Sequence, residues 1–216
     1  MTAKEARAQV EAAALVAIVR GDHEPDDVLA IGEALVRGGI NAIEITLNSY
    51  RALDALSLLA RRLGDRALIG AGTVRTLEQV DKASSAGARY LIAPGIDIDC
   101  VAAARERDLL FIPGVFTATE IDLALKHDCE LLKFFPASGV LPEYLAAMRG
   151  PFPQARFMAT GGIGVKDIAA YHRAGAVAFG IGSSLVNAGK TAKEIEATAR
   201  SFIEEVARVR TENGAV

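Results

Sequence analysis

Apolar runs of five to eight residues alternate with amphipathic segments along the whole sequence. The runs are rich in β-branched side chains, which is typical of buried strands. The segments between them repeat apolar residues every three or four positions, as one face of a helix does, and several end at a glycine. Eight strands are predicted in this way, at residues 15–20, 40–47, 67–73, 90–94, 109–115, 131–137, 156–162 and 177–182.

The order of these elements predicts an α/β fold, a (β/α)8 barrel with a helix before its first strand. Helical segments such as 26–39, 76–87 and 118–128 separate the strands, at about 25 residues per strand–helix unit. A doubly wound open sheet would have fewer strands and a glycine-rich nucleotide-binding sequence after the first, where this chain has RGD at 20–22. We therefore expect residues 1–216 to form one barrel domain.

Two predicted strands carry a charged residue on the face that should point into the barrel. Side chains alternate between the two faces of a strand. In residues 40–47 two isoleucines take one face and Glu44 the other, and in residues 131–137 Lys133 is flanked by side chains of the opposite face. The residues expected to face the helices are Ile43, Ile45, Leu132 and Phe134.

Lys133 is the only lysine predicted to lie in a strand. Burial disfavours the charged form and lowers the pKa of a lysine, which supplies a free amine near neutral pH. A free amine can form an imine with a substrate carbonyl, and a protonated imine draws electrons from a neighbouring carbon–carbon bond. Glu44 is the natural partner for moving protons to and from such a substrate. The alternative is that Lys133 and Glu44 form a simple ion pair inside the barrel.

Glycines cluster at the ends of the last two predicted strands, in TGGI (160–163) and GIGSSL (180–185). Backbone N–H groups at such positions can approach a ligand closely, and the loops after strands seven and eight of this fold often hold a phosphate. The alternative is that these glycines only make tight turns. The candidate phosphate ligands are Gly161, Gly162, Gly182 and Ser183.

Composition and charge narrow the classes of partner. The formal net charge is −3 and the basic residues form no block, which argues against nucleic acid and anionic membranes as partners. No apolar run reaches the roughly 18 residues of a membrane span, and the charged N-terminus lacks the apolar core of a signal peptide. Cys100 and Cys129 stand alone, and no two of the three histidines have metal-ligand spacing. We expect a cytoplasmic protein without a metal site.

Six short motifs, in order and with matching spacings, closely resemble the class I 2-keto-3-deoxy-6-phosphogluconate aldolases, also called KDPG/KHG aldolases. The motifs are EITL (44–47), GAGTV (70–74), APG (93–95), IPGV (112–115), KFFPA (133–137) and TGGI (160–163). The resemblance implies a homotrimeric barrel enzyme of the Entner–Doudoroff pathway, without metal or organic cofactor. Such an enzyme cleaves a phosphorylated keto acid reversibly to pyruvate and glyceraldehyde 3-phosphate, and 4-hydroxy-2-oxoglutarate is a further expected substrate.

The resemblance also assigns roles to individual residues. Lys133 matches the lysine that forms the Schiff base in that family, and Glu44 matches its general acid/base. Thr73 matches a threonine near the pyruvate carboxylate. The remaining matches are Pro94 and Phe135 in the substrate pocket and Gly161, Gly162 and Ser183 in the phosphate cradle. Thr160, in the TGGI motif, is a further candidate for substrate binding.

One residue departs from the gluconate-type pattern. Asn48 stands where many of those members have an arginine, and LNS (47–49) looks more like the 2-keto-3-deoxy-6-phosphogalactonate aldolases. KFFPA and Thr160 look more like the gluconate type, which we favour. Since a buried carboxylate needs a cation, we expect Arg20 at the end of the first strand to bind it together with Thr73. The alternative is that Arg20 pairs with Asp22 or Glu44.

Two other functions remain open for this chain. A sugar-phosphate isomerase or epimerase on the same barrel would use Glu44 as a base without an imine. A barrel that only binds phosphorylated ligands would need neither Lys133 nor Glu44 for chemistry.

Overall fold

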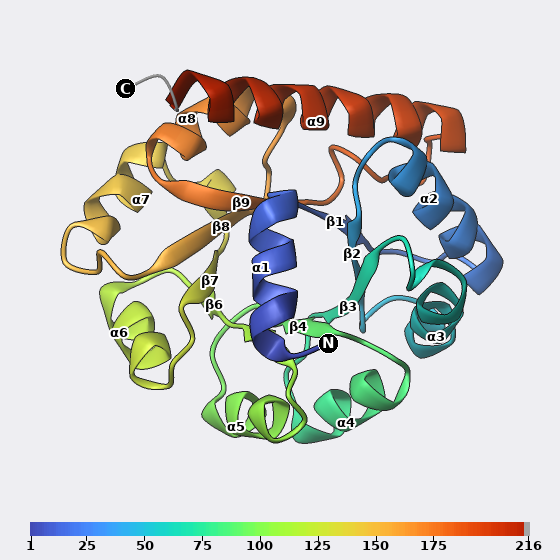
Figure 1. The fold of residues 1–216 in the computed structure, drawn as a ribbon, viewed down its shortest axis with the longest axis horizontal. Helices are drawn as coiled ribbons and strands as arrows, with labels where there is room; N and C mark the ends of the chain where they lie inside the picture. The colour runs from blue at the N-terminus through green and yellow to red at the C-terminus, as the bar shows by residue number, and fades with distance from the viewer. Residues whose placement is uncertain (214–216) are drawn as a thin grey trace.

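Parallel strands form a barrel that is surrounded by helices, in the computed structural model of residues 1–213 (Figure 1). The strands are β1 (Leu15–Val19), β2 (Ala42–Thr46), β3 (Leu68–Gly72), β4 (Tyr90–Ile92), β5 (Leu110–Ile112), β6 (Gly114–Val115), β7 (Leu131–Phe134), β8 (Arg156–Thr160) and β9 (Ala176–Ile181). The α-helices are α1 (Ala3–Ala13), α2 (Pro25–Arg37), α3 (Ala52–Leu63), α4 (Leu77–Ser85), α5 (Ile98–Glu106), α6 (Ala118–Lys126), α7 (Pro142–Arg149), α8 (Ile168–Arg173) and α9 (Ala192–Asn213). Two short 3-10 helices are η1 (Ala137–Gly139) and η2 (Val165–Asp167).

The predicted (β/α)8 barrel is confirmed, with one of its eight strands divided in two. The predicted strand 109–115 is interrupted at Pro113, which has no backbone N–H to donate to a neighbouring strand. Its first part, β5, pairs with β4, and its second part, β6, pairs with β7. The hydrogen-bonded order is therefore β5-β4-β3-β2-β1-β9-β8-β7-β6, and the barrel closes through the divided strand.

Buried side chains form two layers, one inside the barrel and one between the strands and the helices. The outer layer contains Ile43, Ile45, Leu132 and Phe134, which confirms the predicted helix-facing side of β2 and β7. The inner layer is formed by alternate residues of the strands together with two residues of α1, Ala6 and Val10. Burial of apolar surface on both sides of a parallel sheet is the main source of stability in this fold.

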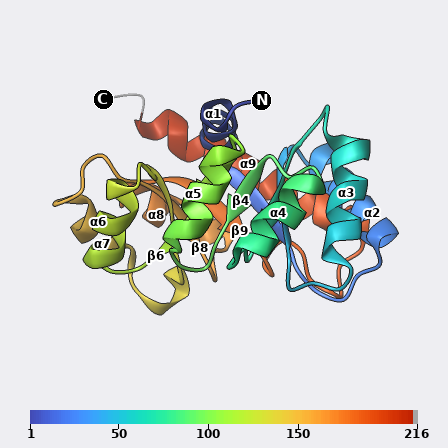
Figure 2. The ribbon, with the colours of Figure 1, turned by 90° about the horizontal axis from the view of Figure 1, so that it is seen from below.

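Helix α1 covers the N-terminal end of the barrel (Figures 1 and 2). The helix begins with a capping box, in which Thr2 and Glu5 satisfy each other's backbone N–H groups. Val10 is completely buried against the interior layer. The opposite end, where the strands terminate, is left for a site. Among residues 1–213, no helix is both long enough and apolar enough to span a bilayer.

Candidate active site

Lys133 and Glu44 both point into the barrel from opposite parts of the sheet. Lys133 lies on β7 and is 2% exposed, and Glu44 lies on β2 and is fully buried. The Glu44 carboxyl leans over Gly72 of β3, where a Cβ would overlap its Oε1 atom. The glycine at that position therefore makes the room that the carboxyl occupies.

Burial moves the pKa values of these two groups toward each other. Burial raises the pKa of Glu44, and the charges of Lys133 and Arg20 only partly offset that effect. Burial lowers the pKa of Lys133, against the opposing influence of Glu44 and with a further lowering by Arg20. A group of raised pKa beside an amine of lowered pKa is the pattern of an acid/base pair that works near neutral pH.

Lys133 and Glu44 form no direct ion pair within residues 1–213. Neither carboxylate oxygen of Glu44 has a hydrogen-bond partner there. The Lys133 ammonium nitrogen instead lies 4.7 Å from the centroid of the Phe135 ring, a distance typical of a cation–π contact. The amine is thus held by the barrel without being neutralised by a contacting carboxylate.

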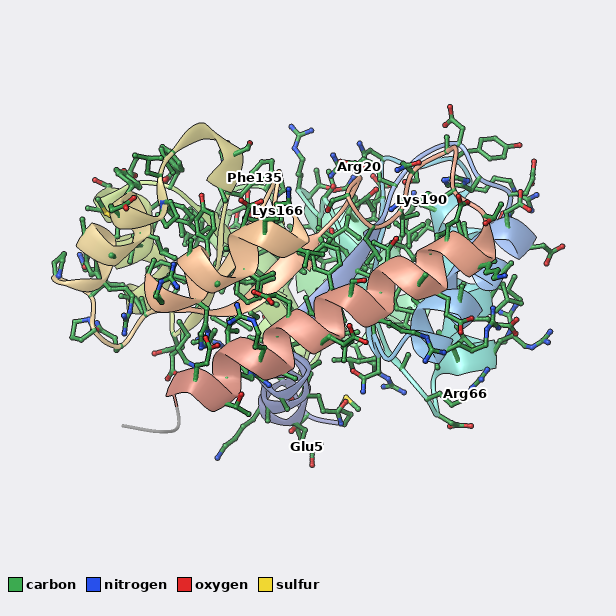
Figure 3. The ribbon with its side chains drawn as sticks, turned by 90° about the horizontal axis from the view of Figure 1, so that it is seen from above. Glu5, Arg20, Arg66, Phe135, Lys166 and Lys190 are labelled. Atoms are coloured by element: carbon green, nitrogen blue, oxygen red, sulfur yellow. The ribbon has the colours of Figure 1, made fainter. Side chains whose placement is uncertain are left out.

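Arg20 faces the same cavity as Lys133. This cavity has a volume of about 380 Å³ and opens at the C-terminal ends of β1, β7, β8 and β9. Figure 3 shows Arg20 and Phe135 on one side of the molecule and Glu5, on α1, on the opposite side. Among residues 1–213, Arg20 makes no ion pair with Asp22 or Glu44, so its guanidinium is available to a ligand.

The LNS segment anchors the loop that carries Arg20. Ser49 Oγ lies 2.8 Å from Thr46 Oγ1 and accepts a hydrogen bond from Gly21 N at 3.2 Å. The backbone N–H of Tyr50 donates to the carbonyl of Gly21 at 3.3 Å. Asn48 itself is exposed. The serine of this motif, rather than the asparagine, therefore connects the ends of β1 and β2.

The two glycine turns line the same cavity. Gly161 and Gly162 have positive φ angles of 97° and 71°, which other residues adopt only with strain. A Cβ on Gly162 would also lie 2.5 Å from the Cβ of Ser138. A hydrogen bond links the two turns: the hydroxyl of Ser184, in the turn after β9, donates to the carbonyl of Ile163, in the turn after β8, at 2.7 Å. A cradle of backbone groups next to a cationic Arg20 suits a phosphorylated acid.

The structure brings most of the predicted site residues to one cavity. Those that line it are Arg20, Lys133, Phe135, Thr160, Gly161, Gly162, Gly182 and Ser183. Glu44, Thr73 and Pro94 do not line it, and Glu44 lies buried deeper in the barrel. Thr73 follows the last residue of β3 with a φ of 59° and is half-buried, and Pro94 follows β4 and is exposed.

Sequence reasoning missed several residues that shape this cavity. Ile18, Ser184, Val186 and Asn187 also line it, and Ser138 lies beside Gly162. Ser184 follows directly on a predicted ligand in GIGSSL and could have been included for that reason. Ser138 carries no such signal, because it lies in the loop after β7 and meets Gly162 only through the fold.

Other reactive side chains lie outside the cavity. Cys100 and Cys129 are buried free thiols, and burial raises their pKa values to about 12 and about 11. Within residues 1–213, no three His, Cys, Asp or Glu side chains are grouped so that they could hold a metal ion.

Comparison with known proteins identifies the family of this chain. The family model described as KDPG and KHG aldolase matches residues 6–200. The 2-dehydro-3-deoxy-6-phosphogalactonate aldolase of Escherichia coli K12 is 35% identical over 190 residues, covering 88% of this chain and 92% of the relative. The 2-dehydro-3-deoxy-phosphogluconate aldolase of Dickeya dadantii is 37% identical over 149 residues, covering 68% of each chain.

A solved structure agrees with these relatives. The crystal structure of the 2-keto-3-deoxy-6-phosphogluconate aldolase of Zymomonas mobilis ZM4 with 3-phosphoglycerate superposes with a TM-score of 0.84 at 32% identity. The match covers 92% of this chain and 95% of that one. The chain therefore belongs to the KDPG and KHG aldolase family and is an aldolase, a carbon–carbon lyase.

Proposed function

We propose that this protein cleaves 2-keto-3-deoxy-6-phosphogluconate reversibly to pyruvate and glyceraldehyde 3-phosphate through an imine on Lys133. One observation carries the proposal. A buried lysine, whose pKa is lowered and whose amine contacts no carboxylate, shares a cavity with Arg20 and two glycine turns. Such a cavity combines a nucleophile with groups that can bind anions, as a phosphorylated keto acid requires.

The chemical steps follow from the two titratable groups. The Lys133 amine attacks the C2 carbonyl of the substrate, and loss of water leaves a protonated imine. Glu44 takes the proton of the C4 hydroxyl, the C3–C4 bond breaks, and its electrons move to the imine nitrogen to give an enamine. Glyceraldehyde 3-phosphate leaves. The enamine is protonated at C3 by Glu44, and water then releases pyruvate and regenerates the amine.

The remaining groups are proposed to hold the two anionic ends of the substrate. Arg20 would bind the carboxylate through its guanidinium fork. Backbone groups at Gly161, Gly162, Gly182 and Ser183 would bind the phosphate. Phe135 and Thr160 would contact the carbon chain between these ends, whereas Thr73 and Pro94, which do not line the cavity, would act from its margin.

A second candidate substrate is the C4 epimer, 2-keto-3-deoxy-6-phosphogalactonate. Two observations favour it, namely the Ser49 contacts that organise the Arg20 loop and the galactonate-type relative in Escherichia coli. The test is to measure pyruvate release from each purified epimer. We expect kcat/KM to be at least tenfold higher for the gluconate. A reversed ratio would assign the galactonate reaction, and no pyruvate from either substrate would contradict the proposal.

We further propose that the protein acts as a homotrimer in the cytoplasm, within the Entner–Doudoroff pathway. These assignments rest on the family to which the chain belongs.

A further inference from the structure

Tyr90 and Glu44 place two buried polar groups over the same strand of the barrel. Tyr90 belongs to β4 and Glu44 to β2, and β3 lies between them in the sheet. The end of the Tyr90 ring lies over Gly70, where a Cβ would overlap Cζ and both Cε atoms. The Glu44 carboxyl lies over Gly72 in the same manner. The two glycines of GAG (70–72) therefore leave room for a phenol and a carboxyl side by side.

The spacing of these glycines places the two polar groups near each other on one face of β3. Gly70 and Gly72 point to the same face of β3, since side chains alternate along a strand. At about 3.3 Å per residue, their Cα positions are about 6.6 Å apart. A water that accepts from one group and donates to another spans about 4.5 Å between them, and at most about 5.5 Å. Because the phenol and the carboxyl overhang these two positions on one face, one water molecule between the side chains would contact both.

Neither group has another partner within the described chain. The Tyr90 hydroxyl and both Glu44 oxygens are completely buried and form no hydrogen bond to a protein atom of residues 1–213. Leaving such groups unpaired destabilises the folded state. A phenylalanine at position 90 would fill the same volume without this cost, so the hydroxyl of Tyr90 calls for a role. Burial and the charge of Glu44 raise the pKa of Tyr90 well above its usual value, so the phenol keeps its proton and can donate.

Tyr90 approaches Glu44 from the closed end of the barrel. Gly70 precedes Gly72 along β3, so the phenol lies nearer to α1 than the carboxyl does. Like Glu44, Tyr90 does not line the substrate cavity. The other charged groups that act on Glu44 are Lys133 from β7 and Arg20 from the end of β1. A hydrogen bond from Tyr90 would thus reach Glu44 from the side of α1.

We infer that Tyr90 is a positioning residue for Glu44, whose phenol donates through one internal water to the carboxylate and stabilises its ionised form. This inference rests on the proposed role of Glu44 in proton transfer. Hydrogen bonding to the charged form of an acid favours that form and opposes the effect of burial. Tyr90 therefore sets the pH above which Glu44 can act as a base, without touching the substrate.

The test is the pH dependence of hydrogen–deuterium exchange at C3 of pyruvate, followed by NMR at saturating pyruvate. Exchange requires the imine and a base but no aldehyde, so its acid limb reports the ionisation of Glu44 in the imine complex. Tyr90→Phe should move this limb up by about one pH unit. The KM for pyruvate should remain unchanged. A limb that coincides with that of the wild type would overturn the inference.

Two further proteins make the result specific. Tyr144→Phe is the matched control, because the Tyr144 hydroxyl donates to the carbonyl of Phe116 at 3.0 Å and has no contact with Glu44. Its limb should not move. If Tyr90→Phe fails to fold, the wild-type protein is instead produced with 3-fluorotyrosine at its four tyrosine positions. The fluorinated phenol is a stronger hydrogen-bond donor. The limb of this protein should move down, and an unmoved limb would again overturn the inference.

Stability provides a readout that does not depend on activity. Burial raises the pKa of Glu44 in the folded state above its unfolded value, so the free energy of unfolding falls as the pH rises from the unfolded pKa to the folded one. Tyr90→Phe should enlarge this loss, so the gap in melting temperature from wild type should widen with pH. In a Glu44→Gln background the gap should not change with pH. A gap that is independent of pH in both backgrounds would contradict a Tyr90–Glu44 link, whether or not the protein is an aldolase. Absence of pyruvate exchange in the wild type would instead contradict the proposed function.

Discussion

At the scale of single residues, burial explains why Lys133 and Glu44 can work together. Each charged form is destabilised by the barrel interior, and each is supported by the charge of the other. The two groups remain close enough to interact electrostatically but form no contact pair among the described residues. A contact pair would hold the lysine in its charged form, whereas the observed arrangement leaves the amine free to react.

Glu44→Gln should separate imine formation from proton transfer. The amide retains the volume over Gly72 but cannot take a proton, so cleavage should slow by roughly 10²–10⁴-fold. The Lys133 imine with pyruvate should still form, and its formation should still increase with pH through the lowered pKa of Lys133. Single-turnover absorbance and steady-state cleavage measure the two steps. A folded variant that forms no imine would show that Glu44 has a different role.

Arg20→Ala should weaken pyruvate binding without damage to the fold. Loss of a bidentate, charge-assisted contact corresponds to about 2–3 kcal/mol, so the KM for pyruvate in the condensation direction should rise roughly 30- to 150-fold. Adding Asn48→Arg should recover part of this loss, since Asn48 follows β2 at the same rim. Arg62→Ala, in the last turn of α3, is the control. An unchanged KM in Arg20→Ala would remove Arg20 from the carboxylate site.

At the scale of elements, the site is built from loops that start where the strands end. Most residues predicted as the ends of strands lie just beyond them, including Arg20, Phe135 and the pair Gly161–Gly162. The loop after β7 is fixed from behind by Tyr171, whose hydroxyl donates to the carbonyls of Ala137 and Val140 at 2.7 and 3.0 Å. Short strands with anchored loops place functional groups at one rim of the barrel.

Gly162→Val should affect phosphate recognition selectively. The position combines a φ of 71° with a Cβ 2.5 Å from that of Ser138, so valine must displace the loop after β7 or the turn itself. The KM for the phosphorylated substrate should rise at least tenfold, with little change for unphosphorylated 2-keto-4-hydroxyglutarate. Gly150→Ala, at the end of α7, should change neither substrate. Equal losses on both substrates would indicate damage to the barrel.

The sequence predicted the barrel well because its signals are local. Alternation along β2 and β7 assigned the faces correctly, and the glycine clusters marked the turns after β8 and β9. Division of the fifth strand at Pro113 was missed, although a proline within an apolar run is a known interruption. The positions of Thr73 and Ser138 depend on the conformation of loops and on contacts between distant segments, which periodicity does not contain.

At the scale of the whole molecule, one end of the barrel is closed by packing and the other carries the cavity. The N-terminal end is closed by α1, whose buried Ala6 and Val10 extend the interior layer. The C-terminal end carries the cavity with Lys133 and Arg20. Glu44 and Tyr90 lie between these ends and are shielded from solvent, so the pKa of Glu44 is set by the surrounding protein groups.

The proposed trimer is tested by light scattering on the purified protein. With a chain mass of 22.7 kDa, three copies should give a particle of about three times that mass at micromolar concentration. A monomer that retains full cleavage activity would contradict the proposed assembly and leave the chemistry of the barrel unaffected.

The central claim is that Lys133 forms an imine with pyruvate, and borohydride trapping tests it most directly. The protein is incubated with pyruvate, reduced and digested, and the peptide masses are read. Lys133→Met, which should fold and lose cleavage, and Lys126→Met, which removes an exposed lysine paired with Asp122, are the controls. We expect one reduced pyruvyl group on the Lys133 peptide of the wild type and of Lys126→Met, and none in Lys133→Met. An adduct at another lysine, or no adduct in a folded and active wild type, would contradict the account.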